Sequence, residues 1–321
     1  MKVIGGFYEL LLPEESFSYH EDAVALSNGR ACIRLMIENS DIKKCYLPNY
    51  TCDAVFHPFD LEQVPYELYN IDENMDPLSF PELAEGEYFY YINYFGIKNS
   101  TVEKLYAIYG DRLIIDNTHD FFKKRQDGCW SFTSARKYFG VSDGAFLYSP
   151  KNIDVHFERF HNFSLNHSVE RLKGNQGQAF REYQEYEKGL NSDINRISLL
   201  SEKMLSLVNV QKVAKSRKEN FRILHEMLGG INKFKLDKID DDDTPFAYPF
   251  IPAGRLSKTS LYDDNIFIPS LWVDPLKRSE TNKYERGFAE TLMPLPIDER
   301  YRKEDMEFMA GRIMDIMERN V

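Results

Sequence analysis

The fold of this chain is decided by residues 131–145, which read SFTSARKYFGVSDGA. The apolar run Trp130–Thr133 predicts a strand, and Ala145–Ser149 predicts the next strand. Between them the chain carries Ser134 and then Lys137. Because α/β folds place functional side chains at the carboxyl ends of strands, Lys137 is a candidate functional residue.

The neighbours of Lys137 favour a reactive amine over an ordinary surface lysine. Arg136 precedes it, and Tyr138 and Phe139 follow it. The like charge of Arg136 would lower the pKa of Lys137, and the aromatic rings would remove water from the amine. A lysine that forms a Schiff base needs that lowered pKa near neutral pH.

Two further segments lie at expected strand or helix ends. Ser27-Asn28-Gly29-Arg30 opens an expected helix, where free backbone N–H groups can hold a phosphate, although an ordinary helix cap has the same pattern. The apolar run Leu113–Ile115 ends in Asp116, with His119 three residues later. An acid here would suit a charged heterocycle, and a simple turn is the alternative.

Short apolar runs alternate with helical patterns through the first half of the chain. The expected strands are Lys44–Leu47, Val64–Ile71, Tyr88–Phe95, Arg112–Asn117, Trp130–Thr133 and Ala145–Ser149. The expected helices are Arg30–Glu38, Thr51–Phe59 and Thr101–Tyr109. Nearly continuous apolar strands that alternate with helices predict an α/β domain with a mostly parallel sheet.

The second half has a different pattern. Residues 156–190 are polar and aromatic with few strand signals, and Ile194–Leu228 has the apolar spacing of one or two long helices. Expected strands at Phe246–Ile251 and Asn265–Ile268, with a closing helix at Lys303–Met317, predict a smaller α+β unit. We therefore expect a large domain over residues 1–190, with a divergent segment 156–190, and a helical connection and small domain over residues 191–321.

Composition limits the classes of partner. The 321 residues carry 40 basic and 51 acidic groups, a net charge of -11, which disfavours binding to nucleic acid. The four cysteines are Cys32, Cys45, Cys52 and Cys129, and their spacing predicts neither disulfides nor a metal site. With no signal-peptide pattern and no apolar run long enough to cross a membrane, we expect a cytoplasmic protein without a membrane partner.

In this order and spacing, the segments resemble fold-type I pyridoxal-phosphate enzymes, and most closely the DegT/StrS-type sugar aminotransferase family. The resemblance is carried by Cys45–Val55 (CYLPNYTCDAV), Tyr91–Gly96 (YINYFG), Asp116–His119 (DNTH) and Ser131–Ala145. It implies the fold-type I transferase architecture, in which a mostly parallel sheet of the seven-stranded type lies between helices. A smaller C-terminal α+β domain follows in that architecture.

The resemblance implies pyridoxal 5'-phosphate as the cofactor and three catalytic residues. Lys137 would hold the cofactor as a Schiff base and then move the proton between substrate and cofactor. Asp116 would pair with the protonated pyridine nitrogen, and His119 would hydrogen-bond near the phenolic oxygen of the ring.

The same resemblance implies the remaining cofactor contacts. Asn28, Gly29 and Arg30 would form the phosphate turn, with Ser134 as the better hydroxyl ligand and Ser131 as a second. Cys52 stands where the family has a ring-stacking aromatic, so Tyr50 is expected to stack instead. Asn195 would reach the phosphate of a neighbouring subunit, because the family builds its site at a homodimer interface.

This chain departs from the family pattern in two turns. Gly29-Arg30 stands where the family often has Gly-Thr, and Gly144-Ala145 where it has Gly-Gly. A non-catalytic binding relative on the same scaffold therefore remains an alternative.

The leading interpretation is transamination from glutamate to a keto group of a nucleotide-linked sugar, in cell-surface polysaccharide or related biosynthesis. A pyridoxal-phosphate enzyme with other chemistry, either elimination or an amino-acid substrate, is the second. Sugar dehydratases of the family carry a histidine in place of the lysine, so Lys137 favours transamination.

Overall fold

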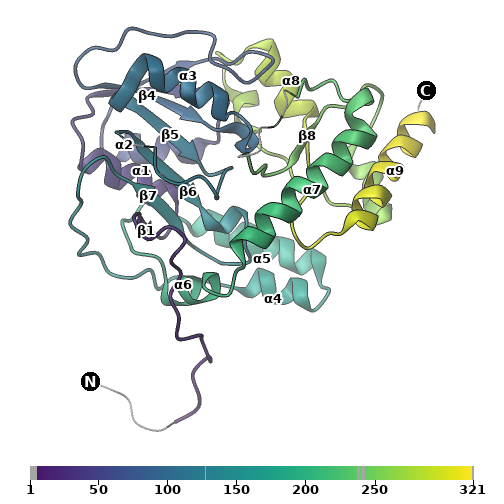
Figure 1. Ribbon diagram of the computed structural model, residues 1–321, viewed down its shortest axis with the longest axis horizontal. Helices are drawn as coiled ribbons and strands as arrows, with labels where there is room; N and C mark the ends of the chain where they lie inside the picture. The colour runs from purple at the N-terminus through teal and green to yellow at the C-terminus, as the bar shows by residue number, and fades with distance from the viewer. Residues whose placement is uncertain (1–5, 127, 237–238, 240–242, 320–321) are drawn as a thin grey trace.

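A seven-stranded sheet forms the centre of the protein, in a computed structural model that describes residues 6–126, 128–236, 239 and 243–319. Its strands lie in the order β1-β7-β6-β5-β4-β2-β3 (Figure 1). They are β1 (Val24–Leu26), β2 (Lys44–Pro48), β3 (Tyr66–Tyr69), β4 (Glu87–Ile92), β5 (Leu113–Asn117), β6 (Trp130–Ser134) and β7 (Ala145–Tyr148). Only β7 runs against its neighbours, so the expected mostly parallel sheet is confirmed.

The register of the central strands brings three strand ends together. Ile92 of β4 pairs with Asp116 of β5, and Asn117 of β5 pairs with Thr133 of β6. The carboxyl ends of these parallel strands therefore lie along one edge of the sheet. The segments after β4, β5 and β6 meet there.

Helices cover the sheet. Those of the sheet domain are α1 (Gly29–Glu38), α2 (Phe56–Leu61), α3 (Asn99–Tyr109), α4 (Asn166–Leu172), α5 (Gln176–Gly189) and α6 (Leu199–Leu205). Helix α1 packs against β6 and β7, and α3 packs against β5. Every residue of β5 and β6 is buried, which requires that both faces of these strands are covered.

A second apolar core lies beside the sheet domain (Figure 1). It is built by α7 (Val210–Leu228), β8 (Tyr248–Phe250), β9 (Met293–Leu295) and α9 (Lys303–Arg319), while α8 (Lys283–Thr291) packs on the first core. Helices α7 and α9 contact each other, and β8 pairs with β9 in antiparallel fashion. The domain boundary between residues 190 and 191 stays a prediction.

Two details differ from the expected elements. Strand β1 was not expected, because three residues carry too little periodicity to stand out from a loop. The strand expected at Asn265–Ile268 is absent from the described residues. Ile266 and Ile268 are apolar because they are buried in the second core, and their segment makes no strand pairing.

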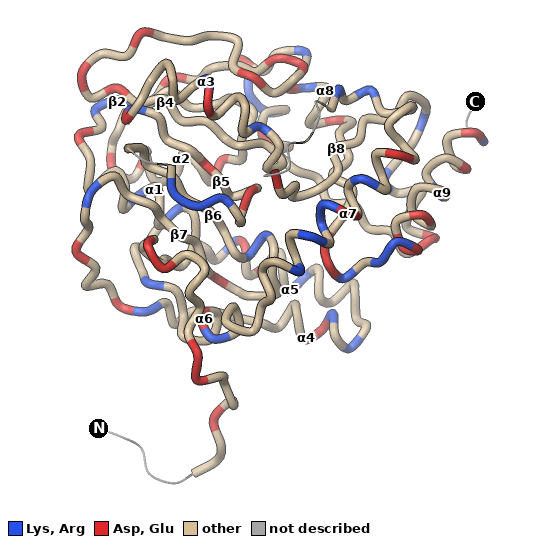
Figure 2. The backbone as a smooth tube through the Cα atoms, viewed as in Figure 1, with Lys and Arg blue, Asp and Glu red and all other residues tan. Residues whose placement is uncertain are grey.

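The divergent segment folds into a helical hairpin. Helices α4 and α5 pack on each other, and α4 has no buried residue while α5 buries only Ala179. Figure 2 shows acidic and basic residues side by side on α7 and α9 and on the loops around the sheet. Within the described part of the chain, no helix has the length and apolar character needed to cross a membrane.

Candidate functional site

Lys137 lies at the carboxyl edge of the sheet. It ends a 3₁₀ turn, Ala135–Lys137, that directly follows β6. Its Nζ donates a hydrogen bond to Thr118 Oγ1 at 3.2 Å, and Thr118 directly follows β5. Two neighbouring strand ends therefore position the amine.

The surroundings of Lys137 lower the pKa of its amine. Desolvation is the main cause, and the positive charge of Arg136 acts in the same direction. Asp116, Cys52 and Glu187 oppose the shift by Coulomb attraction. The side chain keeps its access to solvent although protein atoms surround it, as a group that lines an opening does. A ligand can thus reach an amine that loses its proton more readily than an ordinary lysine.

Asp116 is held by two hydrogen bonds at the end of β5. Its Oδ2 accepts from the hydroxyl of Tyr90 at 2.7 Å, and its Oδ1 accepts from the backbone N–H of Thr118 at 2.8 Å. The side chain is buried. Because both bonds are made to donors, they stabilise the carboxylate and fix its direction.

His119 is packed among aromatic rings. Its ring centroid lies 4.3 Å from that of Phe246 and 4.8 Å from that of Trp272. Burial lowers the pKa of His119 well below its ordinary value, and the charge of Lys137 adds to this. Its Nδ1 has no hydrogen-bond partner in the part of the chain that the structure describes. The imidazole is therefore neutral and has a nitrogen available.

The first turn of α1 lies next to the Lys137 turn. Asn28 caps the helix, and its Oδ1 accepts from the N–H of Ala31 at 3.0 Å. A Cβ added to Gly29 would meet the ring of Phe132 at 3.4 Å and the methyl group of Thr118 at 3.7 Å. Helix α1 therefore directs its positive end toward the residue that holds Lys137.

Ser134 and Ser131 are separated by the geometry of β6. Residues three apart on a strand point to opposite faces and lie roughly 10 Å apart. Ser134 ends β6 beside the Lys137 turn, whereas Ser131 pairs with Ile115 and Tyr148 farther back in the strand. Only Ser134 is brought to the cluster.

Tyr50, expected to stack on the cofactor ring, lies in an aromatic cluster, and its stacking role stays a prediction. The ring of Tyr50 lies among Trp272, Tyr94 and Phe288, at centroid distances of 5.3 to 5.8 Å. The thiol of Cys52 instead interacts electrostatically with Lys137, which lowers its pKa against the larger, opposite effect of burial. The charge of Lys137 therefore acts on the Cys52 thiol, whereas the ring of Tyr50 packs in an aromatic cluster with Trp272, Tyr94 and Phe288.

Asn195 lies behind the Ser27–Asn28 turn. Its backbone carbonyl accepts from the N–H of Ser27 at 2.9 Å, so the segment extends the sheet edge next to β1. Its predicted contact with a neighbouring subunit's phosphate stays a prediction.

Three site residues were missed by the sequence reasoning. Tyr90 holds Asp116, Thr118 holds Lys137, and Trp272 packs on His119. Tyr90 belongs to an apolar strand, where nothing distinguishes a hydroxyl that forms a hydrogen bond from simple core packing. Trp272 could have been singled out in the sequence, because it is one of two tryptophans. In the structure its backbone has a positive φ of 47°.

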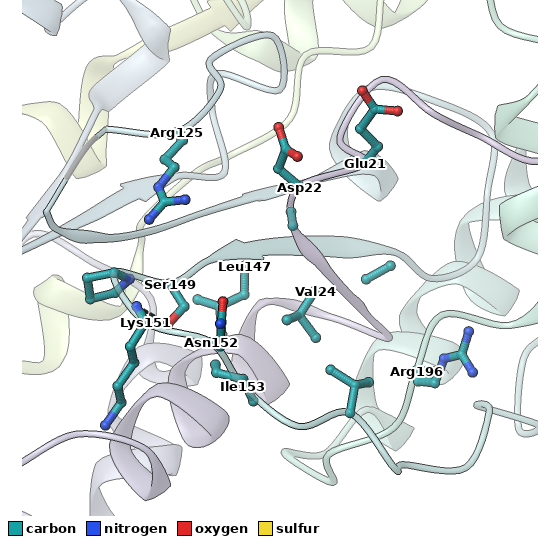
Figure 3. Close-up of a pocket in the computed structure, with 14 residues that line it drawn as sticks. Glu21, Asp22, Val24, Arg125, Leu147, Ser149, Lys151, Asn152, Ile153 and Arg196 are labelled. Carbon is teal, nitrogen blue, oxygen red and sulfur yellow. Dashed lines mark hydrogen bonds between the residues drawn. The ribbon is translucent and has the colours of Figure 1, made fainter.

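A cavity of about 600 Å³ lies at the opposite edge of the sheet (Figure 3). It is lined in part by Glu21, Asp22, Arg125, Lys151 and Asn152, which surround the start of β1 and the end of β7. Because β7 runs against β6, the end of β7 lies at the amino edge of the parallel strands. This cavity is therefore separate from the Lys137 cluster.

Metal ligands do not gather in the described part of the chain: no group of three or more His, Cys, Asp or Glu residues could hold an ion there. The groups that the cluster brings together are the amine of Lys137, the carboxylate of Asp116 and the helix end at Gly29.

Comparisons of the sequence find no match among protein-family models and none among curated proteins. Comparison of the fold finds many solved structures. DesV of S. venezuelae, in complex with a ketimine intermediate, superposes with a TM-score of 0.63 at 13% identity and covers 94% of this chain and 87% of its own. A DegT DnrJ EryC1 StrS aminotransferase from Brucella abortus gives 0.61 at 14% identity, covering 92% and 86%.

A dehydratase is among the structures with the same fold. The E. coli GDP-4-keto-6-deoxy-D-mannose-3-dehydratase with bound hydrated PLP gives a TM-score of 0.61 at 11% identity and covers 91% of this chain and 87% of its own. These three structures share one architecture with the present chain over most of its length. The chain therefore has the fold of the fold-type I pyridoxal-phosphate transferases, as its sequence pattern predicted.

Proposed function

We propose that this protein is a pyridoxal-phosphate-dependent aminotransferase that takes its amino group from glutamate and passes it to a keto group of a nucleotide-linked sugar. The observation that carries the proposal is the meeting of the Lys137 amine, the Asp116 carboxylate and the amino end of α1 at one edge of the sheet. Cell-surface polysaccharide or related biosynthesis is the setting that such a product implies.

The residues present fit the cofactor. Gly29 has no side chain, so a phosphate can approach the first N–H groups of α1. Asp116 offers a fixed buried carboxylate for a ring nitrogen, and His119 Nδ1 lacks a partner among the described residues. These three features match the phosphate, the nitrogen and an oxygen substituent of pyridoxal phosphate.

Lys137 performs the covalent binding and the proton transfer. When bound, pyridoxal phosphate supplies an aldehyde that condenses with amines and a ring that accepts electrons. Lys137 Nζ would hold that aldehyde until the amino donor took its place, and the freed amine would then carry the proton that leaves the donor's α-carbon. Its lowered pKa keeps a larger fraction of the amine unprotonated at neutral pH.

Asp116 and the helix end orient the cofactor. The Tyr90 hydroxyl and the Thr118 N–H fix the direction of the Asp116 carboxylate, which would pair with the ring nitrogen. The N–H groups of Gly29 and Arg30, with Asn28 and the Ser134 hydroxyl beside them, bind the phosphate.

The proposal includes a cytoplasmic homodimer in which Asn195 of one subunit faces the phosphate site of the other. The amino donor and the keto sugar are its small-molecule partners. Lys137 distinguishes this proposal from sugar dehydration, because a residue that must be released and then move a proton suits amino transfer.

Two additions in sequence test the proposal. Pyridoxal phosphate added to the purified protein should give a yellow absorbance band, and glutamate should then bleach that band as the amino group is taken up. Lys137→Ala should show neither the band nor the response to glutamate. A protein that is colourless after it has been mixed with excess cofactor and separated from the unbound part would contradict the proposal, and a band that glutamate leaves unchanged would exclude glutamate as donor.

A further inference from the structure

Arg136, the residue before Lys137, is paired with a glutamate from the divergent hairpin. Its guanidinium forms a short ion pair with the carboxylate of Glu187, near the carboxyl end of α5. The Arg136 side chain is 17% exposed and that of Glu187 is 30% exposed. An ion pair therefore links the α4–α5 hairpin to the residue next to Lys137, the proposed cofactor lysine.

A second guanidinium contacts the chain just after the end of α5. Arg30, in the first turn of α1, donates to the backbone carbonyl of Leu190 at 3.1 Å. The charge of Glu187 stabilises protonated Arg30, and the charge of Arg136 opposes it. Two arginines from different elements thus lie at one end of α5, and an anion there offsets the repulsion between their charges.

Glu187 belongs to an element with little other anchorage. Leu172 of α4 is 88% exposed and Phe180 of α5 is 57% exposed, so the hairpin buries few of its apolar side chains. An element with few buried contacts opens at low cost. Its attachment to Arg136 is therefore a contact that a competing anion can replace.

We propose that Arg30 and Arg136 form a carboxylate-binding subsite beside Lys137, and that Glu187 occupies this subsite until the carboxylate of the amino donor displaces it. The inference rests on the proposed function for the identity of its ligand. The occupant in the structure is itself a glutamate side chain, so the subsite already holds the functional group that a glutamate donor would present.

Displacement makes the hairpin part of the binding step. A ligand that needs the open form binds with an apparent dissociation constant equal to the intrinsic constant divided by the fraction of molecules in which the subsite is open. The incoming carboxylate takes both guanidiniums, and Glu187 moves into solvent with the end of α5. The wall beside Lys137 then differs between the free and the ligand-bound protein.

Titration with glutarate, the dicarboxylate that lacks the amino group of glutamate, tests the inference without any reaction at Lys137. The measurement is calorimetry on the full chain without cofactor, for the natural protein and for Glu187→Gln. Removing the internal competitor should tighten glutarate binding by about fivefold to tenfold. The matched control is Glu185→Gln, which removes the same charge from an exposed position on the same helix and should leave the affinity unchanged.

Two further arms assign the binding groups. Arg136→Gln introduced into the Glu187→Gln variant should lose most of the gain in affinity. Inorganic phosphate should compete with glutarate only weakly; phosphate binding without glutarate binding would overturn the carboxylate assignment. Amide hydrogen exchange over residues 166–189 should rise in Glu187→Gln and, in the natural protein, on addition of glutarate.

Equal glutarate affinity in Glu187→Gln and Glu185→Gln would refute the inference. So would an Arg136→Gln variant that binds glutarate as tightly as its parent. Because these titrations contain no pyridoxal phosphate, their outcome is separate from cofactor binding. A protein that does not bind pyridoxal phosphate would contradict the proposed function. The difference in glutarate affinity between the variants would still test the subsite.

Discussion

Gly96 allows two turns of the site to touch. It ends the 3₁₀ turn after β4, with a positive φ of 67°. A Cβ at this position would lie 2.3 Å from the carbonyl oxygen of His119 and 3.1 Å from that of Thr244. Only a residue without a side chain fits here, so Gly96 brings the loop that carries His119 against the end of β4.

Gly96→Ala should therefore destabilise the protein by about 3–5 kcal/mol, because the methyl group meets backbone atoms that cannot move away. Gly110→Ala is the matched control: its φ is also positive, at 57°, but nothing lies within 4 Å of the added Cβ. That change should cost about 1–2 kcal/mol. Urea unfolding of both variants measures the difference, and equal losses would contradict this account of Gly96.

At the scale of single residues, the sequence predicted the site residues whose chemical type and position already suggest a function. Lys137, Asp116 and Gly29 lie together as their positions after strands and before a helix suggested. Tyr50 and Ser131 do not join them, because the direction of a side chain depends on the strand pleat and on packing. A shift of one residue along a strand reverses the face, and the sequence alone does not give that register.

Helix α6 is tied to the loop that follows Lys137 by one buried carboxylate. Asp143 Oδ2 accepts from the backbone N–H of Ser198 at 2.7 Å. Its Oδ1 accepts from the hydroxyls of Ser198 at 2.6 Å and Ser201 at 2.5 Å. Asp143 thus caps the amino end of α6 from outside the helix and places a negative charge at its positive end.

Asp143→Asn should lower the free energy of unfolding by about 2–4 kcal/mol, because an amide group turns a donor toward donors and removes the charge. The exposed Asp154→Asn serves as the control and should change stability by less than about 0.5 kcal/mol. Hydrogen exchange should show the loss at α6 first. If α6 stayed protected in Asp143→Asn, the cap would not be what holds this helix.

At the scale of elements, the strands buried on both faces were predicted from sequence and the marginal ones were not. Strands β2, β4, β5, β6 and β7 carry long apolar runs and appear within a few residues of their expected positions. Strand β1 forms only because β7 offers a partner, and Asn265–Ile268 lacks such a partner among the described residues. In both segments, the presence or absence of a pairing partner elsewhere in the chain determined whether a strand formed.

The two cores meet at a pair of buried acids. Asp120, after β5, and Asp243, before β8, are both buried, and Asn99 donates from its side chain to Asp243. Burial raises the pKa of Asp120 to about 7, and the negative charge of Asp243 contributes in the same direction. The folded protein therefore keeps a proton on Asp120 at pH values where the unfolded chain has lost it.

This proton makes the stability of the whole molecule depend on pH. Between the ordinary pKa of 3.8 and about 7, the folded state binds more protons than the unfolded state, so the free energy of unfolding falls as pH rises. The slope from this group is at most about 1.4 kcal/mol per pH unit, and it vanishes above the folded pKa. Denaturant unfolding at pH 5, 6, 7 and 8 measures the slope.

Asp120→Asn should remove that part of the pH dependence, because an amide does not titrate. Near pH 8 the free energy of unfolding of the variant should approach or exceed that of the natural protein. Near pH 5 the natural protein should be at least as stable as the variant. Parallel pH profiles for the two proteins would show that Asp120 does not bind the proton.

At the scale of the whole molecule, the architecture was predictable although the sequence has little similarity to the solved structures with the same fold. Identity to the structurally similar proteins is only 11–15%, yet they cover 91% or more of the chain. The shared fold survives at this identity because it depends on the order of the strands and helices and not on particular residues. The packing of the α4–α5 hairpin against Arg136 could not be read in advance, since it depends on one ion pair from a segment without periodic pattern.

The central claim is that Lys137 holds the cofactor. The most direct measurement is borohydride reduction of the protein mixed with pyridoxal phosphate, followed by peptide mass spectrometry. The account predicts one stable pyridoxyl adduct on Lys137, and none at that site when borohydride is omitted. Absence of label from Lys137, or labelling spread evenly over surface lysines such as Lys212 and Lys215, would contradict it.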